Sequence, residues 1–486
     1  MSVPAAERSV PADVPVLPIV PFGNFRRASV VPPGSKSITN RALVLAALRA
    51  GTTRLSGALF SEDTRAMLDC LRRLGFCVEA DESAGTIRVD GLGGRIPAER
   101  AELFVENAGT AARFLTAFLA LKNGGEFTLD GSAAMRRRPM AGLLDALARL
   151  GCEFEFLGER GFFPFKMRPH GVRAAEISVD ASASSQILSA LLQIAPVAAR
   201  QNGRGIFDVF LKGKTVSQPF VKMTERMIAQ FGGGIEARGN AFACGGGYGA
   251  GTLEYAIEPD ATAASYFLIL PFLHRGSEIF VGGLDCGGLQ GDAAFAFALS
   301  APPNDLLSAT QICGNGAGGN GGIRVVAGTS RRGFSADFNA ISDTFLTLAA
   351  VAPLLDAGAP LEIRGIAHTR RQETDRVAAA ANELSKILGA ENVSQTDDAL
   401  TVRPISRERL RERAAAAPGG RFRIETYRDH RVAMSFGILG TFDLRGNGSP
   451  WIEIADPACC GKTFPAFFDV LKTLGGNGGN PAATRL

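Results

Sequence analysis

Histidine is scarce in this sequence, and the cysteines are scattered. The 486 residues include four histidines and eight cysteines, and no two cysteines form a CxxC pair. Structural zinc sites use closely spaced cysteines and histidines, so the pattern argues against a transition-metal centre. Scattered cysteines are typical of a reducing cytoplasm, where most of them are small buried hydrophobic residues. We therefore expect a cytoplasmic protein with no bound metal.

Long apolar runs and a strong net charge are also missing. No stretch of about 18 apolar residues occurs, so no membrane-spanning helix is expected. Residues 1–30 contain five prolines and lack a basic start, which argues against a signal peptide. The net charge of +4 is weak for a chain of this length, and it predicts neither a nucleic-acid nor a membrane partner.

One pattern occurs six times along the chain. In each copy a cluster of small and polar residues precedes an apolar run, and successive clusters end 72 to 87 residues apart. The clusters are 34–41, 107–113, 180–186, 260–266, 339–344 and 427–431. Repeats of this kind indicate that one structural unit recurs along the chain.

Each copy predicts strands and a buried helix. Ser, Asn and Asp before the runs are typical N-cap residues, and the runs are apolar on nearly all sides. Strand-like alternation occurs at 86–90, 126–130 and 361–364, and a more amphipathic helix is expected at 64–73. Six such units form an α/β protein, most simply as two domains of three units each.

Several clusters carry cations that capping does not require. Lys36, Arg41, Arg113 and Arg431 lie at the predicted helix starts, where a positive charge opposes the helix dipole. A bound anion between the cation and the helix would offset that cost. In the fourth copy, Asp260, Ser265 and Tyr266 carry no cation, and capping alone explains them.

Other basic segments are less specific. The lysines in Gly34-Ser-Lys36-Ser37 and Gly461-Lys462-Thr463 lie beside hydroxyl groups, but neither segment has the glycine spacing of a Walker loop. The 136–138 arginines precede a proline that suits a helix start, and the 368–376 segment mixes arginines with carboxylates. On generic grounds, a solvated helix face explains the 368–376 segment as well as a site does.

Seven ordered motifs together resemble the 5-enolpyruvylshikimate-3-phosphate synthase family. They are GSKSITNRALVLAAL, ENAGTAARFL, RRRPM, ASSQILSALL, QETDR, TYRDHRVAMSFG and GKTFPAFF, and they run from about Pro33 to Phe467. The resemblance implies a two-lobed, inside-out α/β barrel of six βαβαββ units, three per lobe, with buried parallel helices. It places residues 1–32 as an N-terminal arm of the second lobe, 33–257 in the first lobe and 258–486 in the second.

The resemblance also implies a reaction and its site. Family members transfer the enolpyruvyl group of phosphoenolpyruvate to the 5-hydroxyl of shikimate-3-phosphate and release phosphate, within aromatic amino-acid biosynthesis. Shikimate-3-phosphate would contact Lys36, Ser37, Arg41, Ser184, Ser185, Gln186 and Ser217. Phosphoenolpyruvate would contact Lys36, Asn107, Gly109, Arg138, Gln372, Arg376, Arg431 and Lys462.

The implied chemistry is addition followed by elimination. Asp343 matches the position that takes the proton of the attacking hydroxyl, and Glu373 matches the position proposed to protonate C3 of phosphoenolpyruvate. One carboxyl group must be ionised and the other must carry a proton, so their surroundings should separate their pKa values. Lys36 completes the catalytic set. No cofactor is implied, and a monomer is expected.

The sequence departs from the family pattern at four positions. Arginine is usual where Ala134 stands, with Arg138 retained and Arg136 or Arg137 as substitutes. Lysine is usual at Gln372, tyrosine at Phe220 and, frequently, asparagine at His368. We therefore predict weaker phosphoenolpyruvate binding than in members with the full set. Gly109 matches the glyphosate-sensitive form of the pocket and predicts inhibition competitive with phosphoenolpyruvate.

Two other functions stay open at this point. The sister family, which transfers enolpyruvyl to UDP-N-acetylglucosamine, shares the fold and the phosphoenolpyruvate chemistry, but 184–186 and 429–431 match the shikimate group instead. A catalytically weakened paralogue that acts as a binding protein is favoured by Ala134 and Gln372. The presence of Asp343 and Glu373 argues against it.

Overall fold

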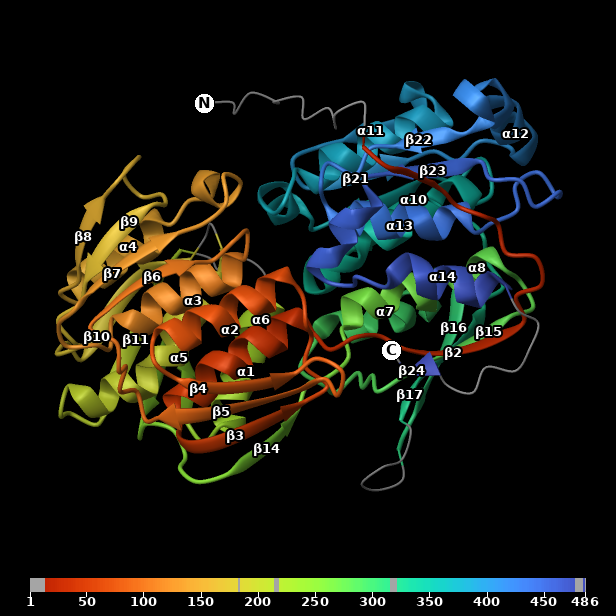
Figure 1. Ribbon diagram of the computed structural model, residues 1–486. Coiled ribbons are helices and arrows are strands. Elements are labelled where there is room, and N and C mark those ends of the chain that lie inside the picture. The colour runs from red at the N-terminus through yellow and green to blue at the C-terminus, as the bar shows by residue number, and fades with distance from the viewer. Residues whose placement is uncertain (1–13, 182–183, 214–217, 315–320, 477–483, 486) are drawn as a thin grey trace. The chain divides into compact units, whose positions relative to one another are not determined.

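The computed structural model describes residues 14–181, 184–213, 218–314, 321–476 and 484–485. The chain divides into two compact units, each of which has its own core. Unit 1 consists of Met1–Pro32 together with Pro259–Leu486, and unit 2 consists of Pro33–Glu258. In Figure 1, unit 2 runs from red through yellow to light green, and most of unit 1 runs from green to blue.

Unit 2 contains three four-stranded sheets with one strand order. In each sheet a parallel pair is followed by two antiparallel strands, which gives the orders β14–β3–β5–β4, β6–β7–β9–β8 and β10–β11–β13–β12. The strands are β3 (Ala50–Ser56), β4 (Cys77–Asp81), β5 (Thr86–Leu92), β6 (Arg100–Phe104), β7 (Glu126–Asp130), β8 (Glu153–Phe156), β9 (Phe165–Arg168), β10 (Glu176–Asp180), β11 (Ile206–Lys212), β12 (Gly234–Arg238), β13 (Ala241–Gly245) and β14 (Leu253–Ala256).

Three buried helices form the centre of unit 2. They are α1 (Lys36–Leu48), α3 (Gly109–Leu119) and α5 (Ser185–Gln201), which pack against one another. Nearly every residue of these helices is buried, as their apolar runs predict. The second helix of each repeat is amphipathic and buries one side: α2 (Glu62–Arg73), α4 (Ala141–Arg149) and α6 (Gln218–Gln230).

Unit 1 repeats the same sheet pattern, with one strand more in its first sheet and one strand fewer in its last sheet. Its sheets have the orders β16–β17–β15–β2–β24, β18–β19–β21–β20 and β1–β23–β22. In the first sheet β24 extends the edge beside β2, and in the last sheet β1 supplies the antiparallel strand beside β23. The strands are β1 (Val16–Pro18), β2 (Arg27–Val31), β15 (Glu278–Gly282), β16 (Leu307–Ile312), β17 (Gly322–Ala327), β18 (Ser335–Asp337), β19 (Leu361–Arg364), β20 (Val393–Gln395), β21 (Ala399–Val402), β22 (Phe422–Ile424), β23 (Ile452–Ala455) and β24 (Thr484–Arg485).

The helices of unit 1 also follow the repeat. The central helices are α7 (Ala261–Leu268), α10 (Phe345–Val351) and α13 (His430–Gly440), and α13 packs against both others. Further helices are α8 (Leu270–Leu273), α9 (Phe295–Ser300), α11 (Arg376–Leu388), α12 (Arg407–Ala416) and α14 (Phe467–Gly476). Short 3-10 turns include η1 (Met135–Arg137), η2 (Gly291–Ala294), η3 (Asn339–Thr344), η5 (Ala367–Arg371) and η8 (Pro457–Lys462). The predicted α/β fold class is confirmed.

The N-cap predictions are confirmed in part. The side chains of Ser184, Asp260 and Asp429 accept hydrogen bonds from the first turns of α5, α7 and α13. The prediction is wrong at Asn107, because α3 begins one residue later and Ala108 takes the N-cap. It is also wrong at Asn339, which lies inside η3, so that α10 starts from a preceding 3-10 turn.

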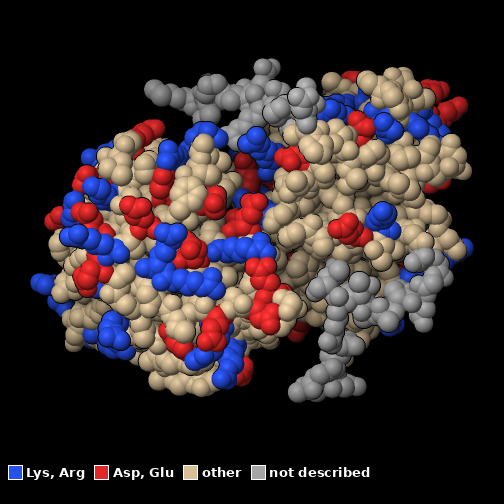
Figure 2. Space-filling view, viewed as in Figure 1, with Lys and Arg blue, Asp and Glu red and all other residues tan. Residues whose placement is uncertain are grey.

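The surface of unit 2 that faces the viewer in Figure 2 carries both signs of charge. Unit 2 has several exposed ion pairs, including Arg65–Glu82 and Arg88–Glu79. Such pairs between solvated side chains contribute little to stability. Among the described residues, no helix combines the length and the apolar character that crossing a membrane requires.

Candidate active site

A buried cluster of charges lies in unit 1, where several helices and turns begin or end. Asp343 lies in η3, Arg376 is the first residue of α11, and Arg431 lies in the first turn of α13. Glu373 lies just before α11, and Lys462 is the last residue of η8. Segments that are far apart in the sequence therefore bring these five predicted site residues together.

Arg376 is the centre of this cluster. Its side chain is 2% exposed and forms ion pairs with three carboxylates. Its nitrogens lie 2.8 Å from Asp429, 2.8 Å from Glu373 and 3.3 Å from Asp343. These carboxylates offset the cost of burying the charge, and they fix the position of its planar guanidinium group.

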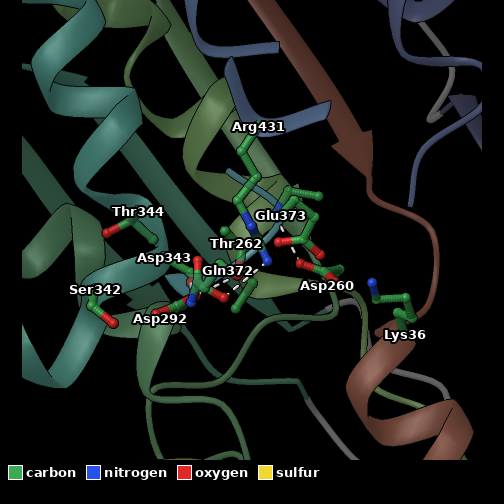
Figure 3. Close-up of polar contacts among 12 residues, drawn as sticks. Lys36, Asp260, Thr262, Asp292, Ser342, Asp343, Thr344, Gln372, Glu373 and Arg431 are labelled. Carbon is green, nitrogen blue, oxygen red and sulfur yellow. Dashed lines mark hydrogen bonds and ion pairs between the residues drawn. The ribbon is translucent and has the colours of Figure 1, made fainter. Parts of the chain in front are cut away.

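Asp343 joins two arginines. Its Oδ2 accepts a hydrogen bond from Arg431 at 2.9 Å, and its Oδ1 accepts one from Gln372 at 3.1 Å. Figure 3 shows Asp343, Gln372 and Arg431 converging on one another. Burial opposes ionisation of Asp343, but Arg431 and then Arg376 outweigh it and hold the pKa of the carboxyl below its ordinary value. Asp343 is therefore ionised at neutral pH.

Glu373 connects Arg376 with Lys462. One of its oxygens lies 2.8 Å from Arg376, and the other lies 3.1 Å from Nζ of Lys462. The three cations of the cluster, Arg376, Arg431 and Lys462, are thus held by carboxylates from different elements. An incoming anion with several oxygens would compete with these carboxylates for the same donors.

The start of α7 adds two carboxyl groups beside the cluster. Asp260 caps α7, since its side chain accepts from the backbone N–H of Ala263 at 2.9 Å. Asp292, in η2, accepts a hydrogen bond from the hydroxyl of Thr262. Both carboxylates help to hold the pKa of Arg431 above its ordinary value, against the effect of its burial. The fourth helix start therefore caps α7, as predicted, and also contributes charge to the cluster.

In unit 2, the start of α1 carries two predicted site cations. Nζ of Lys36 lies 2.8 Å from Oδ2 of Asp63, which belongs to α2. Arg41 is 1% exposed, and its hydrogen bonds in the described part of the chain go to neutral oxygens, the shortest to Thr224 at 2.8 Å and to the Ser37 carbonyl at 2.9 Å. Burial lowers the pKa of Arg41 to about 9.

The start of α3 brings Gly109 and Arg138 into direct contact. A Cβ at position 109 would lie 2.6 Å from a terminal nitrogen of Arg138, closer than any real Cβ contact. Arg138 also donates to the Asn107 carbonyl at 3.3 Å. Only glycine lets the guanidinium approach the backbone this closely. A second arginine, Arg113, is buried nearby, and burial together with Arg138 lowers its pKa to about 9.

The start of α5 holds the predicted serine cluster. Ser184 is the N-cap and accepts from the backbone N–H of Gln186 at 3.2 Å, and Ser185 is the first helical residue. Oε1 of Gln186 is buried without a hydrogen-bond partner among the described residues. Ser217, the remaining predicted contact of the 3-phosphate, lies outside the described residues. Among the described residues, no group of three or more His, Cys, Asp or Glu side chains is arranged to hold a metal ion.

The match to known proteins covers almost the whole chain. Residues 25–471 match the family model for EPSP synthase (3-phosphoshikimate 1-carboxyvinyltransferase). The chain belongs to the EPSP synthase family. A 3-phosphoshikimate 1-carboxyvinyltransferase of Opitutus terrae is 46% identical over 94% of this chain and 97% of its own length. One of Bordetella bronchiseptica is 41% identical over the same shares of the two chains.

A solved structure supports the fold. The EPSP synthase of Acinetobacter baumannii aligns with a TM-score of 0.73, covering 94% of this chain and 98% of that chain at 24% identity. The family and the enzyme class expected from the sequence are confirmed by the family match and by the close relatives. The sister family's reaction and a binding protein without activity are not favoured.

The structure shows what occupies the positions that depart from the EPSP synthase pattern. At position 134 the alanine precedes η1, and Arg136 is exposed and pairs with Asp130 at 2.5 Å. Gln372 hydrogen-bonds both Asp343 and Arg376. The backbone carbonyl of Phe220 accepts a hydrogen bond from Arg41 at 3.4 Å, and the Phe220 ring centre lies 5.9 Å from the Arg41 guanidinium. His368 lies 2.7 Å from the hydroxyl of Ser342.

Four carboxylates in or beside the site were not among the predicted site residues: Asp63, Asp260, Asp292 and Asp429. Asp63 and Asp429 could have been suspected, because one follows a capping serine and the other directly precedes Arg431 as an N-cap. Asp292 carries no such signal in the sequence. It comes near the site only through the packing of η2 against α7 and η3.

Proposed function

We propose that this chain transfers the enolpyruvyl group of phosphoenolpyruvate to the 5-hydroxyl of shikimate-3-phosphate and releases phosphate. The observation that carries the proposal is the buried cluster of Asp343, Arg376 and Arg431 in a chain that matches the EPSP synthase family along its length. We further propose that it acts as a cytoplasmic monomer, with these two substrates as its partners and with neither nucleic acid nor a membrane.

Arg376, Arg431 and Lys462 would bind the carboxylate and the phosphate of phosphoenolpyruvate. Guanidinium groups suit this task because their donors match planar oxygen pairs. In the free chain these cations contact Asp343, Glu373 and Asp429. Anion binding would shift some of these contacts to the substrate, so that Glu373 gives up cationic partners as phosphoenolpyruvate arrives.

That exchange would divide the roles of the two carboxyl groups. Asp343 keeps Arg431 and Gln372 within reach and stays ionised, so it can accept the proton of the 5-hydroxyl as the oxygen attacks C2. Glu373, with fewer cations on its oxygens, could carry the proton that C3 receives. The tetrahedral intermediate would then lose phosphate from C2 and a proton from C3, which Glu373, ionised after the addition step, could take back, and the enol ether would form.

Residues of unit 2 would bind shikimate-3-phosphate. Lys36, Ser37 and Arg41 lie at the start of α1, and Arg41 is a buried cation whose hydrogen bonds to described residues are all to neutral oxygens. Ser184, Ser185 and Gln186 lie at the start of α5, where backbone N–H groups favour a phosphate. Ser217 would also contact the phosphate of shikimate-3-phosphate. The residues that would border phosphoenolpyruvate in this unit are Lys36, Asn107, Gly109 and Arg138.

A comparison of acceptors tests the proposal. Purified protein is given phosphoenolpyruvate with either shikimate-3-phosphate or UDP-N-acetylglucosamine, and phosphate release is followed. We expect release with shikimate-3-phosphate only. Asp343→Asn should lower kcat by roughly a hundredfold or more, the usual contribution of a general base, whereas Asp469→Asn, at an exposed position of α14, should not. Release with the UDP-sugar, or equal rates for Asp343→Asn and the native chain, would overturn the proposal.

A further inference from the structure

Asp292 lies beside the charged cluster without belonging to the proposed substrate contacts. It sits in η2, which packs against α7 on one side and against η3 on the other. Its Oδ2 accepts a hydrogen bond from the hydroxyl of Thr262, in the first turn of α7. Figure 3 shows this pair together with Asp343 and Arg431.

The charges that face Asp292 are unbalanced. They are the carboxylate of Asp343 on η3, the carboxylate of Asp260 at the start of α7 and the guanidinium of Arg431 on α13. Helix α9, which follows η2 directly, contributes no titratable side chain. Arg431 is the one cation of this group, and it already donates to Asp343 at 2.9 Å. Because Asp343 already pairs with both Arg431 and Arg376, negative charge on Asp292 has little cationic compensation.

The two neighbouring carboxyl groups respond in opposite directions. Burial, and then repulsion from Asp343, raise the pKa of Asp292 to about 7, and the Thr262 hydrogen bond moderates this rise. Asp343 accepts a hydrogen bond from Arg431 at 2.9 Å, and the pKa of Asp343 lies below its ordinary value. Near neutral pH, the single proton available to the pair therefore resides on Asp292.

We propose that Asp292 is a positioning residue whose protonated form leaves Arg431 free to bind the substrate anion and keeps Asp343 as the ionised carboxylate. The inference rests on the proposed function, because the anion is taken to be phosphoenolpyruvate. Thr262 acts through Asp292 and sets the pH at which the proton leaves. Neither residue needs to touch substrate for this role.

The sign of the pH effect follows from the charge. Below its midpoint Asp292 is neutral and does not compete with the substrate anion for the guanidinium of Arg431. Above the midpoint Asp292 is ionised and attracts the guanidinium of Arg431 in competition with the substrate, so phosphoenolpyruvate binds more weakly. A bound anion in turn favours the neutral form of Asp292, so binding at higher pH takes up a proton.

Two measurements on native protein and Asp292→Asn test the proposal. Carbon-13 NMR of aspartate-labelled protein should show one carboxyl titrating near pH 7 that is absent from Asp292→Asn, and its midpoint should rise in Thr262→Val. Steady-state kinetics should give equal KM values for phosphoenolpyruvate near pH 6, and by about pH 8.5 the native KM should exceed that of Asp292→Asn roughly tenfold. Because the substrate titrates in the same way with both proteins, the ratio of their KM values cancels this effect.

The controls separate this inference from the reaction. Asp469→Asn removes one exposed carboxylate of the same unit and should keep the native pH dependence, and Thr441→Val tests for a general effect of losing a buried hydroxyl. A KM ratio that does not change with pH would overturn the role of Asp292 while turnover persists. An Asp292 titration midpoint that is the same in Thr262→Val as in native protein would also overturn it. Absence of turnover in native protein would instead overturn the proposed function, and this inference with it.

Discussion

Replacing Arg376 with methionine should destabilise unit 1 more than the same replacement of an exposed arginine. The substitution keeps an apolar stem of similar length but removes a cation that contacts Asp343, Glu373 and Asp429. Asp429 is fully buried and would keep mainly the backbone N–H of Arg431 at 2.9 Å. Removing one partner of a buried charge network costs about 3–5 kcal/mol, because the remaining charges stay buried.

The assay can use an internal reporter. The single tryptophan, Trp451, is fully buried in the core of unit 1 and stacks edge-on against Phe422. Its fluorescence in urea therefore follows the unfolding of the unit that contains Arg376. Arg324→Met is the matched control, because Arg324 is half exposed and lies 3.8 Å from Glu278, and an exposed pair contributes about 0–1 kcal/mol.

The destabilisation should also depend on pH. The folded-state pKa of Asp343 is lowered, so its ion pairs stabilise the protein above the unfolded pKa, and this contribution disappears as pH falls through the folded value. Arg376→Met should therefore cost most near pH 8, and this cost should decrease only below about pH 4, where the carboxyl groups take up protons. Adding Asp429→Asn should restore part of the loss. A change below about 1 kcal/mol near pH 8, or a gap that does not narrow in acid, would refute the reasoning.

Three further predictions follow from single contacts. Gly109→Ala should raise the KM for phosphoenolpyruvate roughly tenfold, or about 1.4 kcal/mol, because a Cβ would displace Arg138. The same change should weaken competitive inhibition by glyphosate. Gly158→Ala is the control in the same kinetic assay, because a Cβ at position 158 would meet only ordinary van der Waals contact. Gln372→Lys should lower that KM severalfold by adding a cation beside Asp343, and an unchanged KM would contradict our expectation of weakened binding. Tyr427→Phe should cost about 1–3 kcal/mol in Trp451-monitored unfolding, since buried Glu383 loses a donor at 2.7 Å, and a loss under about 0.5 kcal/mol would contradict this.

The repeating elements were predictable because they depend on local patterns. Alternation marked β7 at Glu126–Asp130 and β19 at Leu361–Arg364 with the observed bounds, and the apolar runs marked the buried helices. Capping was predictable where an aspartate stands directly at the helix start, as at Asp260. It failed at Asn107, because the backbone of α3 turns one residue later than the polar side chain suggests.

The site was predictable only through cations and family motifs. Positive charge at a helix start conflicts with the helix dipole, and this conflict distinguishes Arg41 and Arg431 from ordinary capping residues in the sequence. The carboxylates that hold the site cations are harder to find, because their partners are distant in sequence. Asp429 pairs with Arg376 across 53 residues, and Asp292 faces Asp343 only because η2 packs against η3.

Deuterium incorporation tests the central claim of enolpyruvyl transfer by addition and elimination most directly. The reaction of phosphoenolpyruvate with shikimate-3-phosphate is run in D2O, and the enol ether product is analysed by proton NMR. Because C3 gains a solvent-derived proton and later loses one, we predict deuterium in the vinyl methylene group, with formation of the labelled product suppressed in Asp343→Asn. An unlabelled vinyl group, or phosphate released without an enol ether, would contradict the account.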